Sequence, residues 1–219
     1  MEKQKEILRV SEIFTSIQGE GTQCGRPMLF IRLSGCNLKC IYCDTQFAFK
    51  KGKEYSLKKL IKEVESEQLL PVYVTGGEPL IQPLTPALVD ELINSAHEVF
   101  VDTNGTLNLG VLNPLVNKII DIKTPGSQAG GEFIASNLEY IAPRDEVKFV
   151  VTSHDDFKWC LDKINTWGIL DLTPNVIFQP AWSMVEPKNL SRWVISSGLP
   201  IRLGLQIHKY IWGPDATAV

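Results

Sequence analysis

The sequence predicts an α/β fold in which parallel strands and helices alternate, as in a complete or partial β/α barrel. Three observations lead to this prediction. Short runs rich in Val, Ile and Phe recur along the chain, amphipathic segments lie between several of them, and turn-forming residues separate the two. Most runs lack regular polar alternation, which is typical of strands buried on both faces. The repeated units are fewer than the eight of a closed barrel, so a partial barrel is expected.

The expected elements follow in order along the chain. Strands are expected at 7–14, 28–35, 72–77, 99–105, 118–124, 147–153, 175–180 and 201–206. Helices are expected in SLKKLIKEVESEQ, LTPALVDELINSAH, DDFKWCLDKINTWG and PKNLSRWVISSG. Ser56 is a suitable N-cap for the first helix, and Thr85 followed by Pro86 is suitable for the second. Gly168 and Gly198 follow the last two, where helices commonly end.

Composition and charge narrow the class of protein. The chain has 219 residues, 44% of them hydrophobic and 21% charged, which is enough to bury a sizeable core. No stretch reads as a linker, so residues 1–219 are expected to form a single domain. A net charge of -3 argues against nucleic acid as a partner and favours a small molecule. No signal peptide or membrane span is apparent, so a cytoplasmic protein is expected, with no membrane partner.

Three of the five cysteines are clustered. Cys36, Cys40 and Cys43 lie in GCNLKCIYCDT, directly after an expected strand, which argues for metal binding rather than disulfides. Three thiolates can hold a four-iron cluster and leave one iron open to a cofactor or substrate. A closed zinc site, the alternative, would need a fourth ligand such as Cys24, and no histidine is close in sequence. Cys160 stands at helical spacing and is expected in the core.

A second motif, VYVTGGEP, follows the next expected strand. Its glycines, Gly76 and Gly77, would let the backbone approach a ligand closely, and the carboxylate of Glu78 could meet an ammonium group. A simple turn is the alternative explanation.

Three further features surround the cysteines. SIQGEGTQCGRP precedes the cysteine-bearing strand, and it is either a binding loop or a polar turn. Arg32 lies within the apolar strand MLFIRLS, where a charge is seldom buried without a partner, so an anionic ligand is favoured over a structural role. Asp44 and Thr45 are hard oxygen donors that would suit magnesium, although an Asx-type turn would also explain them.

The CxxxCxxC spacing after a strand resembles the hallmark of the radical S-adenosylmethionine (SAM) superfamily. Together with QGEG, Arg32, TGGEP and DTNGT, it is similar to the 7-carboxy-7-deazaguanine synthases, from about residue 10 to the C-terminus. The resemblance implies conversion of 6-carboxy-5,6,7,8-tetrahydropterin into 7-carboxy-7-deazaguanine. Hydrogen abstraction from C6, rearrangement and loss of ammonia would depend on a 4Fe-4S cluster, SAM and Mg²⁺. It also implies a homodimer and an external electron donor of the flavodoxin or ferredoxin type.

The resemblance also implies roles for particular positions, and none of them is a general base. The cluster would be held by Cys36, Cys40 and Cys43, and magnesium by Thr45. SAM contacts are expected at Tyr42, Cys43, Asp44, Gly77, Asp121, Ile122, Lys123 and Gln179. Pterin contacts are expected at Ile17, Gln18, Gly19, Arg32 and Thr75.

The chain departs from the resembling family at two positions. It has DIK at 121–123 where some members have serine-proline-lysine, and Asp102 where a glutamate is frequent. Two alternatives remain: a glycyl-radical activating enzyme with the same cysteine loop, and a non-catalytic iron–sulfur or zinc module.

Overall fold

The computed structural model describes residues 7–218 except 51, 68–69 and 130–131. Its strands are β1 (Ile7–Ile17), β2 (Pro27–Leu33), β3 (Lys53–Ser56), β4 (Val72–Gly76), β5 (Val99–Thr103), β6 (Asn117–Asp121), β7 (Glu146–Val151), β8 (Val176–Pro180) and β9 (Arg202–Leu203). Its α-helices are α1 (Leu57–Glu65), α2 (Thr85–Asn94), α3 (His154–Thr166), α4 (Ile169–Leu172), α5 (Pro187–Ser197) and α6 (Ile207–Trp212). Among these described residues, no helix has the length and apolar character needed to cross a membrane.

The strands form one sheet in the order β3-β1-β2-β4-β5-β6-β7-β8-β9. Within the described part of the chain β3 and β9 are its edges, so the sheet is an open, partial barrel, as the sequence predicts. Strands β2 and β4 to β9 pair in parallel. The expectation of a parallel arrangement is wrong for β1, which is antiparallel to both β2 and β3. The turn from β1 to β2 is too short for the crossover that a parallel pair requires.

Most helix boundaries agree with the sequence. Ser56 caps α1, because its side chain accepts a hydrogen bond from the Lys59 backbone N–H at 3.3 Å. Gly198 ends α5 in the left-handed conformation, with φ of 65°. Thr85 is not an N-cap, however. It lies inside α2, and its hydroxyl donates to the Pro79 carbonyl at 2.6 Å.

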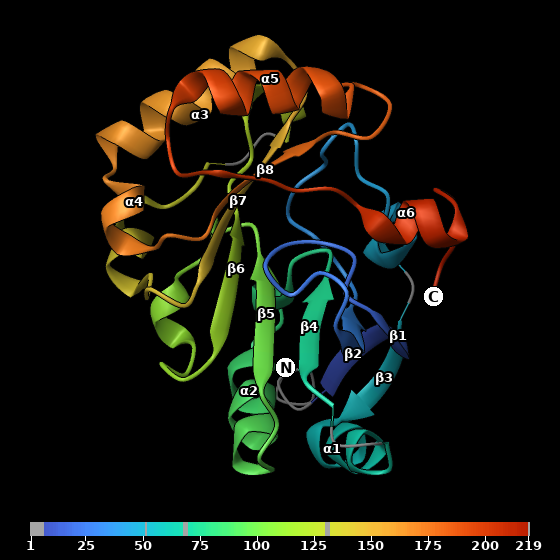
Figure 1. Cartoon of the computed structure of the whole chain (residues 1–219). Helices are drawn as coiled ribbons and strands as arrows, with labels where there is room; N and C mark the ends of the chain where they lie inside the picture. Colours follow the sequence, from blue (N-terminus) through green and yellow to red (C-terminus); the bar gives the residue numbers. More distant parts are fainter. Residues whose placement is uncertain (1–6, 51, 68–69, 130–131, 219) are drawn as a thin grey trace.

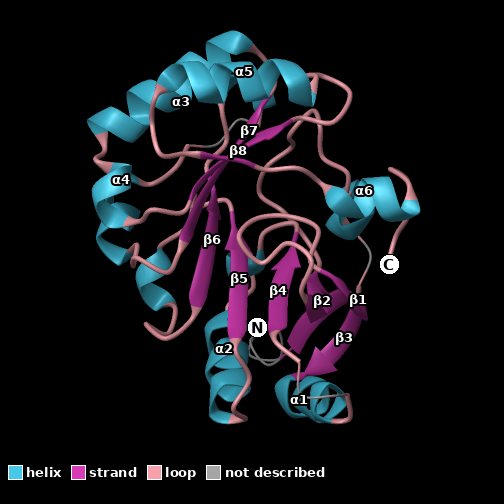
Figure 2. Ribbon diagram, viewed as in Figure 1, coloured by secondary structure: helices cyan, strands magenta, loops and turns pink. Residues whose placement is uncertain are grey.

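The helices cover one face of the sheet in two groups. Side chains of β1, β2, β4 and β5 pack with α1 and α2, including Leu60 and Leu88. Side chains of β6, β7 and β8 pack with α3, α4 and α5, including Phe149 and Cys160, which confirms Cys160 as a core residue. Figure 1 shows these two groups at different ends of the curved sheet, and Figure 2 shows the strands between them.

The opposite, inner face changes character along the strands. A cluster of Met28, Phe30, Tyr73, Phe100 and Ile119 packs near the beginning of the parallel strands. Two residues further along each strand, polar side chains lie on the same face, because side chains alternate between the faces of a strand. These polar residues are Arg32, Thr75, Asp102, Asp121, Lys148 and Gln179. The carboxyl ends of the strands therefore form a polar surface that the helices do not cover.

Phe149 tests the packing of the second core group. Its side chain is fully buried, and its ring centroid lies 5.5 Å from that of Phe178 and 6.4 Å from that of Trp159. Phe149→Ala is expected to lower the free energy of unfolding by about 3–5 kcal/mol, because it leaves a cavity. Denaturant unfolding of the reconstituted protein measures this. Ile195→Ala, at a position 79% exposed on α5, is the control and is expected to change stability by less than about 0.5 kcal/mol.

Candidate active site

A cavity of about 540 Å³ lies over the polar half of the inner face. Its walls are the ends of the parallel strands, the cysteine loop after β2, the QGEG loop after β1, and the last residues of the chain. In an open α/β sheet, the carboxyl ends of the strands are where ligands commonly bind. The cavity is therefore the candidate active site.

Cys36, Cys40 and Cys43 all line this cavity. Their loop is tied to the segment after β6, because the Ile41 N–H donates to the Ser127 carbonyl at 3.0 Å. The Leu38 N–H points at Cys36 Sγ, 3.4 Å away, as backbone donors do at cluster sulfurs. Burial raises the pKa of Cys40 to about 11, so coordinated iron would have to favour the thiolate.

The three thiols do not form a compact site for one ion. In the described residues, no three His, Cys, Asp or Glu side chains are gathered closely enough to hold a single metal ion. A closed zinc site needs such a group, whereas a four-iron cluster places each thiolate on a different iron. The three thiols therefore need not lie closer together than they do here to bind a four-iron cluster.

The TGGEP segment packs directly against the cysteine loop. A Cβ added to Gly77 would lie 2.2 Å from the Gly35 carbonyl oxygen and 2.5 Å from Cys36 Cβ, so only glycine fits. Glu78 does not point at a ligand, contrary to the role suggested by its sequence. Its carboxylate is buried and accepts hydrogen bonds from the backbone N–H groups of Leu80 and Asn104 and from the Thr103 hydroxyl, at 2.7–3.0 Å. Glu78 thus joins the loop after β4 to the loop after β5.

Three buried polar atoms around the cavity lack a hydrogen-bond partner within the described part of the protein. They are Tyr42 Oη, Asp121 Oδ1 and Gln179 Oε1, from the cysteine loop, β6 and β8. Buried polar atoms are rarely left unpaired. A ligand with several donors and acceptors, such as SAM, would satisfy them, and these residues therefore fit that cofactor.

Arg32 has a partner in the protein. Its Nε donates to Glu12 Oε2 on β1 at 2.8 Å, and its guanidinium carbon lies 5.9 Å from the ring centroids of Phe14 and Phe47. Glu12 thus balances the charge of Arg32 within the protein, and the expectation that Arg32 also binds an anionic ligand stays a prediction. Arg32 and Thr75 are nevertheless register partners that both line the cavity.

The cavity floor carries a buried ionic network centred on Lys148. Lys148 Nζ lies 3.0 Å from Glu20 Oε2, 3.3 Å from Asp121 Oδ2 and 3.7 Å from Asp102 Oδ2. Lys123 also pairs with Asp121, at 2.9 Å. Burial would lower the pKa of Lys148, but Asp102, Glu20 and Asp121 together hold it well above its ordinary value.

The end of the chain closes one side of the cavity, a role that the sequence did not predict. The Ile207 N–H donates to the Gly19 carbonyl at 3.0 Å, and Gln206 Nε2 donates to Glu20 Oε1 at 2.7 Å. The His208 ring packs over Gly19, and residues 214–218 add to the wall.

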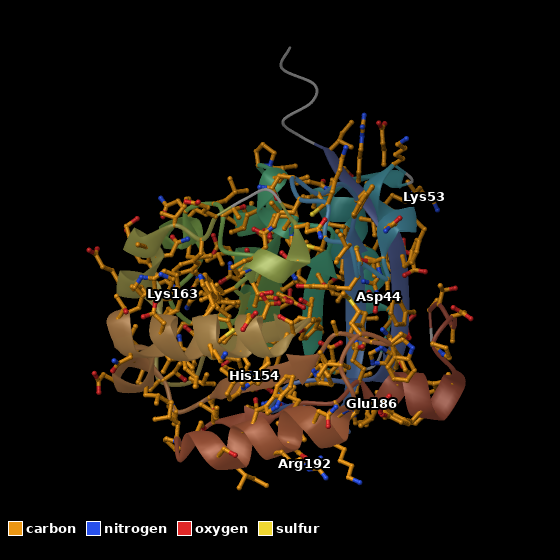
Figure 3. The ribbon with its side chains drawn as sticks, turned by 90° about the horizontal axis from the view of Figure 1, so that it is seen from above. Asp44, Lys53, His154, Lys163, Glu186 and Arg192 are labelled. Carbon is orange, nitrogen blue, oxygen red and sulfur yellow. The ribbon has the colours of Figure 1, made fainter. Side chains whose placement is uncertain are left out.

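Helix α6 also reaches the cysteine loop. Lys209 Nζ pairs with Asp44 Oδ2 at 2.8 Å and lies 5.3 Å from the Trp182 ring centroid. Figure 3 shows Asp44 beside the strands, on the side of the molecule where α6 lies.

The structure brings together nearly all the residues expected at the site. The cavity is lined by Ile17, Gln18, Gly19, Arg32, Cys36, Cys40, Tyr42, Cys43, Asp44, Thr45, Thr75, Gly77, Asp121, Lys123 and Gln179. The exception is Ile122, whose side chain packs in the core with α3 instead of lining the cavity, because it points to the other face from Asp121 and Lys123. Glu20, Asp102 and Lys148 line the cavity without having been expected as ligands, and His208 lines it as well.

Comparisons with known proteins agree with this geometry. Residues 30–172 match the sequence model of the Radical SAM superfamily. The 7-carboxy-7-deazaguanine synthase of Koribacter versatilis is 36% identical over 97% of this chain and 100% of its own length. That of Chlorobaculum tepidum is 40% identical over 97% of both chains. The crystal structure of QueE from Escherichia coli aligns with a TM-score of 0.77 and 24% identity over 91% of this chain and 94% of its own.

The fold, the three-cysteine loop and the superfamily match define the class: this chain is a radical SAM protein, a class that uses a 4Fe-4S cluster and SAM. Its relatives define the family more closely. With 36% and 40% identity over essentially the whole length of both chains, it belongs to the 7-carboxy-7-deazaguanine synthase family.

Glu78 gives the site a testable dependence on pH. Burial raises its pKa from 4.5 to about 7, so between these values the folded state holds a proton that the unfolded state has released. Stability due to this group is therefore greatest below pH 4.5 and falls as the pH rises through 7. Glu78→Gln is expected to destabilise the protein by on the order of 1–3 kcal/mol at about pH 5, because its amide has two N–H groups where the protonated acid has one O–H, and one of them would face the Asn104 N–H.

The difference in stability between wild type and Glu78→Gln is expected to be smaller at about pH 8, because the Glu78 carboxyl of wild type has then lost its proton. Anaerobic thermal unfolding of the reconstituted proteins at both pH values measures it. Glu91→Gln, at an exposed position of α2, is the control, and it should change the stability by the same small amount at both pH values. A difference that stays constant or widens at the higher pH would contradict the assignment.

Proposed function

We propose that this chain is a 7-carboxy-7-deazaguanine synthase that acts on 6-carboxy-5,6,7,8-tetrahydropterin with loss of ammonia. The observation that carries this proposal is the single cavity that joins the cysteine loop, TGGEP, the QGEG loop and Arg32. Family membership over the full chain supports the same reaction. When bound, the cluster and SAM supply a carbon radical that abstracts a hydrogen atom.

The protein's own residues would hold the two cofactors side by side. Cys36, Cys40 and Cys43 would bind the cluster, and the backbone at Gly77 lies against that loop, so a ligand of the open iron would meet both. Tyr42, Asp121 and Gln179 would complete the SAM pocket with their unpartnered atoms, alongside Lys123 and backbone groups near Asp44 and Ile122.

The pterin would occupy the side of the cavity bordered by β1, β2, β4 and β5. Gln18 is oriented for this role, because its Oε1 accepts from the Glu20 N–H at 3.1 Å. Arg32 is fixed by Glu12 and two aromatic rings, so its guanidinium meets the substrate without reorganisation. Ile17, Gly19 and Thr75 complete this wall. The chain end would exclude water from the radical.

Magnesium would bind at Thr45. Its Oγ1 lies 3.6 Å from Cys43 Sγ, between the cluster loop and the cavity. Magnesium normally keeps waters and takes few protein ligands, so substrate carboxylate and water would complete its shell.

We further propose a cytoplasmic location, a homodimer and an external flavodoxin-like or ferredoxin-like electron donor. The three-cysteine cluster needs an electron for each initiation, and a soluble donor of low potential is the ordinary source. The absence of a spanning helix from the described residues is consistent with this location.

The decisive experiment is anaerobic turnover by the reconstituted protein. With SAM, reductant, Mg²⁺ and 6-carboxytetrahydropterin, it is expected to form 7-carboxy-7-deazaguanine and an equal amount of ammonia, both measured chromatographically.

Cys40→Ala is expected to lose the cluster absorbance and the product, because the remaining two thiolates cannot hold four irons. Cys24→Ala, which changes an exposed cysteine outside the cavity, is the matched control and should retain both. SAM cleavage without deazapurine formation in wild type would contradict the proposed substrate.

Thr45→Ala tests the magnesium assignment. Loss of one ligand is expected to raise the Mg²⁺ concentration for half-maximal rate by about tenfold or more, with iron content unchanged. Titration of turnover against Mg²⁺ measures it, and Thr166→Ala at the exposed end of α3 serves as control. An unchanged Mg²⁺ requirement in Thr45→Ala would remove Thr45 as a ligand.

A further inference from the structure

Lys148 is a buried cation on the cavity floor that neither the cluster nor the SAM pocket described above uses. It lies in the middle of β7, and its side chain is 5% exposed. Three carboxylates from three different elements converge on it: Glu20 from the QGEG loop, Asp102 from β5 and Asp121 from β6. All four residues line the cavity.

The groups that face this network come from several elements, and Tyr42 and Cys40 of the cysteine loop are among them. Besides the three carboxylates, they include Lys123 beside Asp121, Tyr73 on β4, whose hydroxyl donates to Asp102 Oδ2 at 3.2 Å, Glu146 on β7, and His208 of α6 beside Glu20. The carboxylates of Glu20, Asp102 and Asp121 outnumber the ammonium groups of Lys123 and Lys148 by one. The floor therefore keeps an excess of acceptors that a ligand with N–H donors would suit.

Stability alone is a poor explanation for this arrangement. Removing several charges from water costs more than ion pairing usually returns, and apolar residues of similar size often serve a core equally well. These charged side chains nevertheless line the cavity and do not lie in the core on the other face of the sheet. Their position indicates a role toward the bound molecule.

The carboxylates differ in how many of their oxygens already have a hydrogen-bond or ion-pair partner in the protein. Glu20 is held at both oxygens, by Gln206 Nε2 at 2.7 Å and by Lys148 Nζ at 3.0 Å. Asp102 is held at Oδ2, by the Tyr73 hydroxyl and more distantly by Lys148. Asp121 also has an unpartnered oxygen, Oδ1, but the proposed SAM pocket uses it. Asp102 Oδ1 therefore remains for a second ligand, and Glu20 anchors Lys148.

We propose that Lys148 is a positioning residue that keeps Asp102 and Glu20 ionised, so that Asp102 accepts the N–H donors on the aminopyrimidinone ring of the pterin. This inference rests on the proposed function, because it takes the pterin as the substrate. A carboxylate is a strong acceptor for the paired N–H groups of such a ring, since hydrogen bonds to an ionised acceptor are the stronger kind.

The electrostatics of the two carboxylates agree with this role. Burial would raise the pKa of Glu20, but Lys148, Gln206 and His208 lower it to about 2. Burial raises the pKa of Asp102 above its ordinary value even though Lys148 opposes the rise. Without the ammonium group, both carboxyls would take up protons at higher pH and cease to be good acceptors.

Lys148→Met tests the proposal, because it removes the charged Nζ and keeps an unbranched side chain of nearly the same length. The measurement is the dissociation constant of 6-carboxytetrahydropterin, by anaerobic calorimetry on the holoenzyme with SAM and Mg²⁺ but without reductant. Binding is expected to weaken by about tenfold or more at about pH 8. The ratio of variant to wild-type dissociation constants is expected to grow further toward about pH 6, as the carboxyls become protonated.

Lys118→Met is the matched control. Lys118 Nζ pairs with Asp145 Oδ2 at 2.9 Å, and its side chain is also 5% exposed, but neither residue lines the cavity. This variant is expected to lower stability and to leave pterin binding equal to wild type at both pH values. If Lys148→Met gives a ratio that does not change with pH, or if Lys118→Met weakens binding equally, Lys148 is a structural residue only and the proposal is wrong.

Asp102→Asn keeps the proposal testable if Lys148→Met does not fold. It retains the shape of the side chain and the Lys148–Glu20 pair, and it is expected to weaken pterin binding by about tenfold at about pH 8. The ratio of variant to wild-type dissociation constants should become smaller toward acid pH, because wild-type Asp102 then becomes protonated as well. This trend is opposite to the one expected for Lys148→Met. Binding equal to wild type would overturn the inference. Wild type that neither binds nor converts the pterin would instead overturn the proposed function, so the two failures are distinguishable.

Discussion

The alternation of side chains across the parallel strands is the constraint on which the site depends. One face of the sheet is apolar and covered by helices, so the register of every strand is fixed by its packing. Because side chains alternate, this register also determines which residues lie on the other face. Register pairs such as Arg32 with Thr75 and Asp121 with Lys148 place side chains from distant parts of the chain next to one another. The core thereby positions the cavity-lining groups.

Charge on that inner face imposes a second constraint. Burial alone would raise the pKa of Asp121, but Lys123 and Lys148 lower it below its ordinary value. The same lysines would be costly to bury without the carboxylates. Lysines and carboxylates must therefore occur together on this face, and their ion pairs hold the side chains in position before a ligand binds. A polar floor with fixed geometry needs little reorganisation when charge develops during a reaction.

Much of the fold and of the site follows from local sequence patterns. Cys36, Cys40 and Cys43 fall on one loop at a strand end because their spacing is short, and any such loop brings them together. The apolar strands and the helices capped by Ser56 and ended by Gly198 are likewise local signals. The antiparallel β3 was missed, because KEYS has a single buried residue and no apolar run.

Lys148 shows why part of the site was not predicted. VKFVVTS reads as an apolar strand, yet Glu146 and Lys148 alternate with Val147 and Phe149, and this period of two marks a strand with one polar face. Lys148 is a lone lysine within an apolar strand, as Arg32 is a lone arginine within another, and both patterns indicate a polar inner face. What the sequence could not supply is the identity of the partners, since the Lys148–Glu20 contact joins residues 128 positions apart.

The chain end completes what a partial barrel lacks. An open sheet leaves one side of its inner face without a wall, and a reactive radical must be kept from water. Helix α6 is only six residues long, and its sequence has no periodicity that marks it as part of a site. Its contacts are nevertheless specific: its N-cap residue Gln206 donates to Glu20, 186 positions away, and Lys209 pairs with Asp44 beside the cysteines. Because α6 bonds both the QGEG loop and the cysteine loop, it links the proposed pterin side of the cavity to its cluster side.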